Sequence, residues 1–220
     1  MRTVHAIRAV TAVVLLVSLF SLSGCSILGV IAYKLGQEEK TPAEFTPSDK
    51  PMLVLVESYR SQAAFEAAGD ELAADLTELL KTNKVAPVIS AEKLIEYRTA
   101  HFDTYDQKRI QTIGRDIGAG QVLYVNMKQL GVTTPTGGDV YEGTVDVRVK
   151  VVDVGTGRTL WPTGSNDGYQ VQVEGEDAMV LKADTPSKHA VQSQMLSDLA
   201  EQIARLFYAY RPENDDHKKD

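Results

Sequence analysis

The sequence has few of the residues that build disulfide frameworks, metal centres and nucleic-acid interfaces. It contains 220 residues with a single cysteine, so neither an internal disulfide nor a cysteine-based metal site can form. Lysine and arginine number 23 against 30 aspartate and glutamate residues, which gives a formal net charge of −7. No stretch gathers the basic residues that phosphate binding requires. We therefore expect no nucleic-acid partner and no metal ion.

The usual catalytic signatures are also missing. There is no His-x-x-x-His pair and no Gly-x-Ser-x-Gly turn, and His101 and His189 are far apart with no partner at ligand spacing. Most aspartates and glutamates fall on the polar sides of predicted helices. We therefore expect a protein that is not an enzyme, with no catalytic residue, no cofactor and no small-molecule substrate. A catalytic site assembled from distant residues stays open as an alternative.

The N-terminus has the composition of a secretory signal peptide. A short arginine-containing region precedes residues 9–22, which carry no charge and are rich in valine and leucine. The segment ends in Leu22-Ser23-Gly24-Cys25, which resembles the lipobox of bacterial lipoproteins. Small residues beside Cys25 leave the backbone accessible to the processing enzymes, and a thiolate is the nucleophile for thioether formation with the lipid. We predict a signal peptide over residues 1–24 and lipidation at Cys25.

An uncleaved transmembrane anchor is the alternative reading of this segment. Residues 9–33 are uncharged and long enough to cross a bilayer, but Ser23-Gly24-Cys25 interrupts them. Both readings place the rest of the chain outside the cytoplasm. Ser26 stands where the sorting pattern of Gram-negative lipoproteins has an aspartate for inner-membrane retention. That resemblance favours the outer membrane, with the protein attached through the lipid on Cys25 and facing the periplasm.

Composition divides the processed chain into a tether, one domain and a tail. Residues 36–50 are polar and contain two prolines, so we predict a lipidated N-terminus and flexible tether over residues 25–50. Residues 51–211 have the length and patterning of a single domain. Residues 212–220 form a charged tail with nothing to bury, which we expect to be disordered.

Hydrophobic periodicity predicts an α+β sandwich. Alternating or apolar runs predict strands at residues 52–58, 85–89, 121–130, 143–154, 158–161 and 169–173. Apolar stripes predict helices over residues 62–81, after Ser90, after a Thr104-x-x-Gln107 capping box, and from Thr185-Pro186. We expect the order β-α-β-α-β-β-β-α and one mixed sheet, with helices on one face and the other face partly wet.

Two glycine-containing motifs join these elements. Gly118 and Gly120 let the chain leave a helix and enter a strand within few residues, and Gly155 and Gly157 are expected to supply the positive φ of a tight hairpin. A phosphate-cradling loop is the alternative, but Gly114 precedes its strand instead of following it. Trp161, after the hairpin, is expected in the core; the alternative is an anchor for a partner.

These motifs carry a resemblance to a known group of proteins. Gly114, Gly118 and Ala119 give a gly-x-x-x-gly-ala helix end before a strand, and the stretch from Asp153 to Trp161 gives an asp-x-x-thr-gly-x-x-leu-trp hairpin. With the closing amphipathic helix, they resemble the periplasmic domain of the curli-secretion lipoprotein family. Relatives of that family include lipoprotein activators of penicillin-binding proteins and the N-terminal domain of the Tol-system propeller protein. The resemblance implies an envelope accessory protein that binds other proteins.

Three functional hypotheses follow for the chain. The leading one is a lipid-anchored, partner-binding or assembly-supporting lipoprotein, with Asp146, Arg148 and Lys150 as a partner-contact face; the alternative for these residues is a solvated sheet face. A ring-forming secretion-channel component is the second hypothesis. Residues 131–142 and 163–185 are the candidate membrane-crossing insertions, and neither offers two crossing strands. An unrecognised envelope enzyme is the third.

Overall fold

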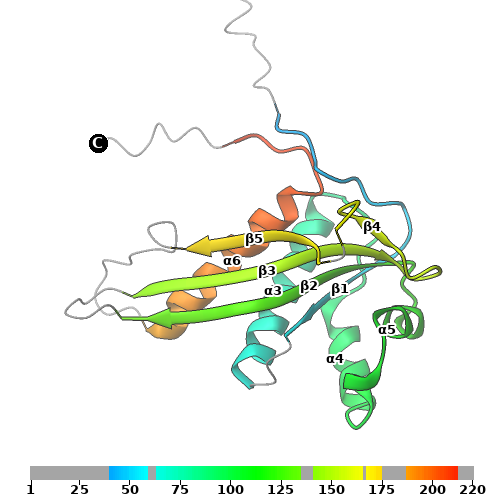
Figure 1. Ribbon diagram of the computed structural model, residues 1–220, viewed down its shortest axis with the longest axis horizontal. Coiled ribbons are helices and arrows are strands. Elements are labelled where there is room, and N and C mark those ends of the chain that lie inside the picture. Colours follow the sequence, from blue (N-terminus) through cyan, green and yellow to red (C-terminus); the bar gives the residue numbers. More distant parts are fainter. Residues whose placement is uncertain (1–39, 59–62, 135–140, 166, 175–186, 213–220) are drawn as a thin grey trace, which may run out of the picture. The chain divides into compact units, whose positions relative to one another are not determined.

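A mixed five-stranded sheet is the frame of the described structure (Figure 1). The structure is a computed structural model that describes residues 40–58, 63–134, 141–165, 167–174 and 187–212. The chain divides into two units, Pro42–Tyr210 and Met1–Thr41 with Arg211–Asp220. The first unit carries the sheet and all the helices described below.

The strand order is open, with a different strand at each edge. β1 (Met52–Glu57) pairs in parallel with β2 (Gln121–Thr133), and β2 pairs antiparallel with β3 (Glu142–Asp153). β4 (Thr159–Trp161) and β5 (Tyr169–Glu174) both pair antiparallel with β3, at different stretches of its length. β2 and β3 are therefore each bonded along both edges and form the interior of the sheet.

Two long helices cover one face of this sheet. They are α3 (Ala63–Thr82) and α6 (Lys188–Arg205). Their buried leucines pack against the inward valines of β3 and the matching residues of β1 and β2; these valines are Val145, Val147, Val149 and Val151. The predicted α+β class, with helices packed on a mixed sheet, is confirmed.

A second, smaller helical layer lies on the opposite face. α4 (Ala91–Ala100), the 3-10 turn η1 (Tyr105–Gln107) and α5 (Ile110–Ile117) pack over β1 and the start of β2. The expectation of helices on one face therefore holds for α3 and α6 but not for α4 and α5. The reason lies in β1, whose residues from Met52 to Val56 are all buried, so both of its faces need a cover.

The expected strand at residues 85–89 is wrong. Val88 makes a single parallel bridge to Met52, flanked by hydrogen bonds from Met52 N to Pro87 O and from Ile89 N to Met52 O, both 2.8 Å. Pro87 has no N–H to donate, so the pairing cannot extend toward residue 85, and in the other direction α4 begins at Ala91. Among the described elements the order is therefore β-α-α-α-β-β-β-β-α, leaving out η1.

The capping box expected at Thr104 does not form. The Thr104 hydroxyl donates to His101 O, and the chain enters η1, whose Tyr105 is buried in the second core; α5 begins only at Ile110. The last helix is capped by the Ser187 hydroxyl, which accepts from Ala190 N at 3.1 Å. The start expected at Thr185-Pro186 lies outside the described residues.

The glycine motif between α5 and β2 serves two different purposes. Gly118 ends α5 in the left-handed conformation with φ of 89°, as expected. Gly114 lets α5 approach the sheet, because a Cβ there would lie 2.7 Å from Val154 Cγ2 and 3.0 Å from Val122 Cγ2. Gly120 is needed for space too, since its Cβ would meet Lys50 at 2.8 Å. The motif is therefore explained by backbone conformation at Gly118 and by packing at Gly114 and Gly120.

Part of the predicted tether belongs to the folded unit. The backbone N–H groups of Glu44 and Phe45 donate to Leu206 O after α6, at 2.9 and 3.1 Å. The Phe45 ring stacks on Trp161, with centroids 6.3 Å apart. Gln121, buried at the start of β2, donates to Ser48 O and Lys50 O at 2.7 and 2.9 Å. Residues 42–50 therefore pack along the domain, ahead of the expected boundary at residue 51.

We expect alanine to change the free energy of unfolding in opposite directions at the two helical glycines that face the sheet. Gly114→Ala should lower the free energy of unfolding by about 1–3 kcal/mol, because the new methyl overlaps two valine side chains. Gly69→Ala in α3 should raise it by about 0.5–1 kcal/mol, because its Cβ finds ordinary contact with Val56 at 3.6 Å and the helix gains stability. Urea denaturation of both variants measures the pair. Equal effects of the same sign would contradict the close-approach explanation.

Candidate partner-binding surface

One face of β3 and β5 is polar and carries no helix in the described part of the chain. The inward valines of β3 point toward α3 and α6, so Asp146, Arg148 and Lys150, which alternate with them, point to the other side. The register places Gln170 opposite Arg148 and Gln172 opposite Asp146 on the same side. α4 and α5 pack over β1 and the start of β2 only, and Figure 1 shows β5 and the far parts of β2 and β3 extending away from them. We call Asp146, Arg148, Lys150, Gln170 and Gln172 the polar face.

The charged side chains of the polar face have contacts that fix their positions. Arg148 Nη1 donates to Asp146 Oδ1 at 2.9 Å, and Arg148 Nε lies 3.3 Å from Asp167 Oδ2. Lys150 Nζ lies over the ring of Tyr124, 5.0 Å from its centroid. The structure therefore brings all three predicted contact residues together on one surface. Asp146, Arg148 and Lys150 are half-buried there, and Gln170 and Gln172 are exposed.

Trp161 is a core residue. It is 8% exposed and contacts three rings: Phe45, Tyr169 and Phe207, with centroids 6.3, 5.1 and 5.6 Å away. These rings come from the N-terminal segment, β5 and the residues after α6. The core interpretation of Trp161 is confirmed, and its ring ties three distant parts of the chain together.

The turn after β3 is built around Asp153. Lys50 Nζ donates to Asp153 Oδ2 at 2.9 Å, while the backbone N–H and the hydroxyl of Thr156 donate to Oδ1 at 2.8 and 2.9 Å. These hydrogen bonds, that of Lys50 first, lower the pKa of the Asp153 carboxyl to about 2. Gly157 has φ of 71°, as expected, but Gly155 does not have the positive φ predicted for it. Only one left-handed residue is needed because the Asp153 carboxylate holds the turn.

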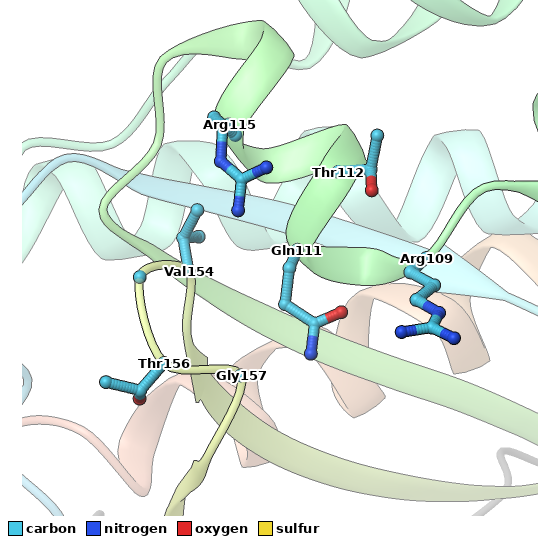
Figure 2. A pocket seen from close by; sticks show the side chains of 8 residues that line it. Arg109, Gln111, Thr112, Arg115, Val154, Thr156 and Gly157 are labelled. Atoms are coloured by element: carbon cyan, nitrogen blue, oxygen red, sulfur yellow. The ribbon is translucent and has the colours of Figure 1, made fainter.

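A polar hollow lies between α5 and this turn (Figure 2). Arg109, Gln111 and Arg115 line it from α5 and the residue before it, and Thr156 and Gly157 line it from the turn. Figure 2 shows Gln111 close to Gly157, where an added Cβ would meet Gln111 Nε2. Gln111 of α5 therefore lies against the glycine of the turn. The two arginines are exposed at the rim.

A second group of polar side chains was missed by the sequence analysis. Glu57, Tyr105, Tyr124 and Asn126 lie together where β1 ends beside the first half of β2, next to Arg98 of α4. The one available signal was a polar residue that follows an apolar run in each strand, Glu57 and Asn126. Pairing the two required the parallel register of β1 with β2.

The lipidation residues Cys25, Leu22, Ser23 and Gly24 lie outside the described residues, so their roles remain predictions. Within the described ranges, none of the helices combines the length and the hydropathy that a bilayer crossing requires. The same ranges contain no group of three or more histidine, cysteine, aspartate or glutamate side chains placed to hold a metal ion.

The sequence matches no protein-family model and no curated protein. Its structure is similar to that of PelC from Paraburkholderia phytofirmans, a dodecamer, with 17% identity and a TM-score of 0.43 over 77% of this chain and 96% of that one. Lipoprotein GNA1162 from Neisseria meningitidis is 18% identical, with a TM-score of 0.41 over 70% of this chain and 97% of that one. The C-terminal domain of LpoB from Salmonella enterica is 18% identical, with a TM-score of 0.34 over 66% of this chain and 93% of that one. Because identities and TM-scores are this low, these likenesses carry no conclusion about the activity, partners or assembly of this chain.

The Asp153 turn predicts a stability loss in acid. The pKa of Asp153 is lower in the folded chain than its ordinary value of 3.8, so its contribution is complete above about pH 4 and is lost as the pH falls toward 2. Asp153→Asn should lower the free energy of unfolding at neutral pH and flatten its pH dependence in that window. Asp103→Asn, at an exposed position, is the control and should change neither. Denaturation curves from pH 2 to 7 measure this; an unchanged slope in Asp153→Asn would contradict it.

Proposed function

We propose that this chain is a lipid-anchored protein of the bacterial cell envelope that faces the periplasm, with the outer membrane favoured over the inner one. The observation that carries the proposal is the sequence Leu22-Ser23-Gly24-Cys25 after an uncharged apolar segment. In this proposal the lipid on Cys25 is the membrane attachment. Residues 26–41 then form the link to the unit that begins at Pro42.

The proposed role of the folded unit is to bind another envelope protein, or to support its assembly, without catalysing a reaction. The polar face supports this role because β3 is bonded along both edges and holds its outward side chains on a rigid backbone. A rigid surface loses little conformational freedom on binding. The ion pairs of Arg148 with Asp146 and Asp167 fix the positions of one cation and two anions on that surface.

If Cys25 is lipidated, the mature protein has a defined mass, and replacing Cys25 abolishes its membrane attachment. The mature protein should begin at Cys25 and carry the mass of a diacylglycerol thioether with further acylation, and it should partition into membranes. Cys25→Ser should be unlipidated and should leave the detergent phase, while Ser26→Ala should remain lipidated. Intact mass spectrometry and phase partitioning measure both. A protein that keeps its first 24 residues and stays membrane-bound as Cys25→Ser would support the transmembrane anchor instead.

Partner binding predicts that crosslinks concentrate on the polar face. A photo-crosslinking amino acid at Gln170 or Gln172, both exposed on β5, should give a defined adduct in cells. The matched controls are Ala74 of α3 and Gln202 of α6, which are exposed on the helical layer of the opposite side and should give none. Adducts of equal yield at all four positions, or at none, would contradict the assignment of this face.

Arg148→Gln separates a binding role from a structural one. The exchange removes half-buried surface ion pairs worth about 0–1 kcal/mol each, so the fold should persist. The adduct at Gln170 should become weaker. If Arg148→Gln unfolds in a urea titration under conditions where the parent protein is folded, the face is part of the structural core and not a contact surface.

A further inference from the structure

The hollow between α5 and the turn after β3 is lined by cationic and neutral residues (Figure 2). Its volume is about 280 Å³, and because a water molecule in the liquid occupies about 30 Å³, side-chain groups of a second molecule have room in it. Arg109 and Arg115 stand at its rim, and Gln111 lies between them in the sequence. No aspartate or glutamate of the described ranges lines it. The hollow is therefore open to solvent and positively charged.

The two arginines of the hollow differ from the paired arginines of the domain. Arg98, Arg148 and Arg205 each donate to a carboxylate within the chain. Within the described ranges, the guanidinium groups of Arg109 and Arg115 form neither an ion pair nor a hydrogen bond. A guanidinium has five N–H donors in a planar fork that matches a carboxylate. Both forks are therefore available to a second molecule.

The carboxylates that come close to the hollow along the chain have other partners. Asp116 of α5 accepts a hydrogen bond from Tyr97 Oη, and its Oδ2 lies 3.8 Å from Lys108 Nζ. Asp153, at the start of the turn, accepts from Lys50 Nζ and from the turn itself. The two arginines therefore keep unpaired positive charge in a chain whose formal net charge is −7.

The spacing of the two arginines favours two anionic groups over one. Arg109 and Arg115 are six residues apart, which corresponds to about 9 Å along a helix axis at 1.5 Å per residue. Figure 2 shows the Gln111 side chain between them in that view, and Gln111 lies against Gly157 of the turn. A single phosphate held by both guanidinium groups would compete with Gln111 for the middle of the hollow. Two carboxylates, one at each guanidinium, leave Gln111 in place.

The hollow lies on the same side of the sheet as the polar face. Lys150 of the polar face lies over the ring of Tyr124. Tyr124 belongs to the second core, together with Ile113 of α5. One protein that covers the polar face can therefore extend along β3 to the hollow at its end.

We propose that the hollow binds an acidic segment of the protein partner, with one aspartate or glutamate side chain on Arg109 and a second on Arg115. Each guanidinium donates two parallel N–H bonds to its carboxylate. Because the chain as a whole is acidic, such a segment is attracted at the hollow and repelled by most of the remaining surface, which fixes where it docks. This inference rests on the proposed partner-binding function and names the chemistry that the partner presents.

The test uses a hexaglutamate peptide in place of the partner. The peptide is acetylated and amidated, so only its side chains carry charge, and it is added at constant ionic strength to the lipidated full chain in mild detergent. With isotope-labelled arginine, the Nε–H signals of Arg109 and Arg115 should shift saturably, while that of Arg205, which is paired with Glu201, should not. Hexaglutamine has the same length and no charge, so it should leave all three signals unchanged. No saturable shift, or equal shifts with both peptides, would overturn the proposal.

Inorganic phosphate tests the alternative occupant. At the same ionic strength it should shift the signals of Arg109 and Arg115 only at higher concentration than hexaglutamate does. Saturation of both signals at a lower concentration of phosphate than of hexaglutamate would assign the hollow to a single phosphate group and would contradict the acidic-segment proposal.

Three matched variants separate the hollow from general charge attraction. Arg109→Gln and Arg115→Gln should each lower the hexaglutamate affinity by about two- to fivefold, as expected for one exposed ion pair. Arg158→Gln removes the same charge from an exposed arginine that follows the turn and does not line the hollow, and it should change the affinity by less than about twofold. Thermal melting checks that the variants are folded. Equal losses in all three variants, or no loss in the first two, would contradict the assignment to the hollow.

The partner itself is tested in cells through the adduct at Gln170. Arg109→Gln combined with Arg115→Gln should lower the yield of that adduct, while Arg158→Gln should not. An undiminished yield in the double variant would show that the partner does not use the hollow, and this inference would be wrong while partner binding by the polar face would stand. Because the peptide titration contains no partner, its outcome is also independent of whether any adduct forms at Gln170.

Discussion

The antiparallel pairing of β2 with β3 is the interaction on which the rest of the structure depends. It runs from Gln121 opposite Asp153 to Thr133 opposite Glu142, with one irregularity between Met127 and Gln129. Because side chains alternate along a strand, a slip of one residue would place the valines of β3 on the open side and its charged residues against α3 and α6. The hydrophobic core and the polar face are therefore two results of the same register.

β1 adds the second constraint. Its residues are apolar on both faces, so it needs helices on both, and α4 and α5 supply the cover that α3 cannot. Close approach of α5 to the sheet depends on Gly114. The second layer ends where β1 ends, and there the chain places Glu57, Tyr105 and Asn126. A polar group at that point is a consequence of covering a short, fully buried strand next to longer ones that continue past it.

Several ion pairs of the domain join elements that are far apart in the sequence. Asp153 joins Lys50 to the turn after β3, Asp70 joins Arg98 of α4 to α3, and Arg148 joins β3 to Asp167 before β5. Glu57 and Asn126 differ because the first is a buried carboxylate stabilised by tyrosines and the second has an acceptor with no donor.

The sequence by itself determined the features that depend on neighbours along the chain. The alternation of β3, the helical stripes of α3 and α6, the helix end at Gly118 and the burial of Trp161 all follow from local patterns. The lipidation motif at Cys25 is local as well, and it remains a prediction. Tertiary structure decided the features that depend on register and on distant partners. It reduced residues 85–89 to a single bridge, drew residues 42–50 into the domain, and placed Tyr105 in a core instead of a capped helix. It also paired Glu57 with Asn126, residues that no local pattern connects, because only strand pairing fixes which side chains share a face.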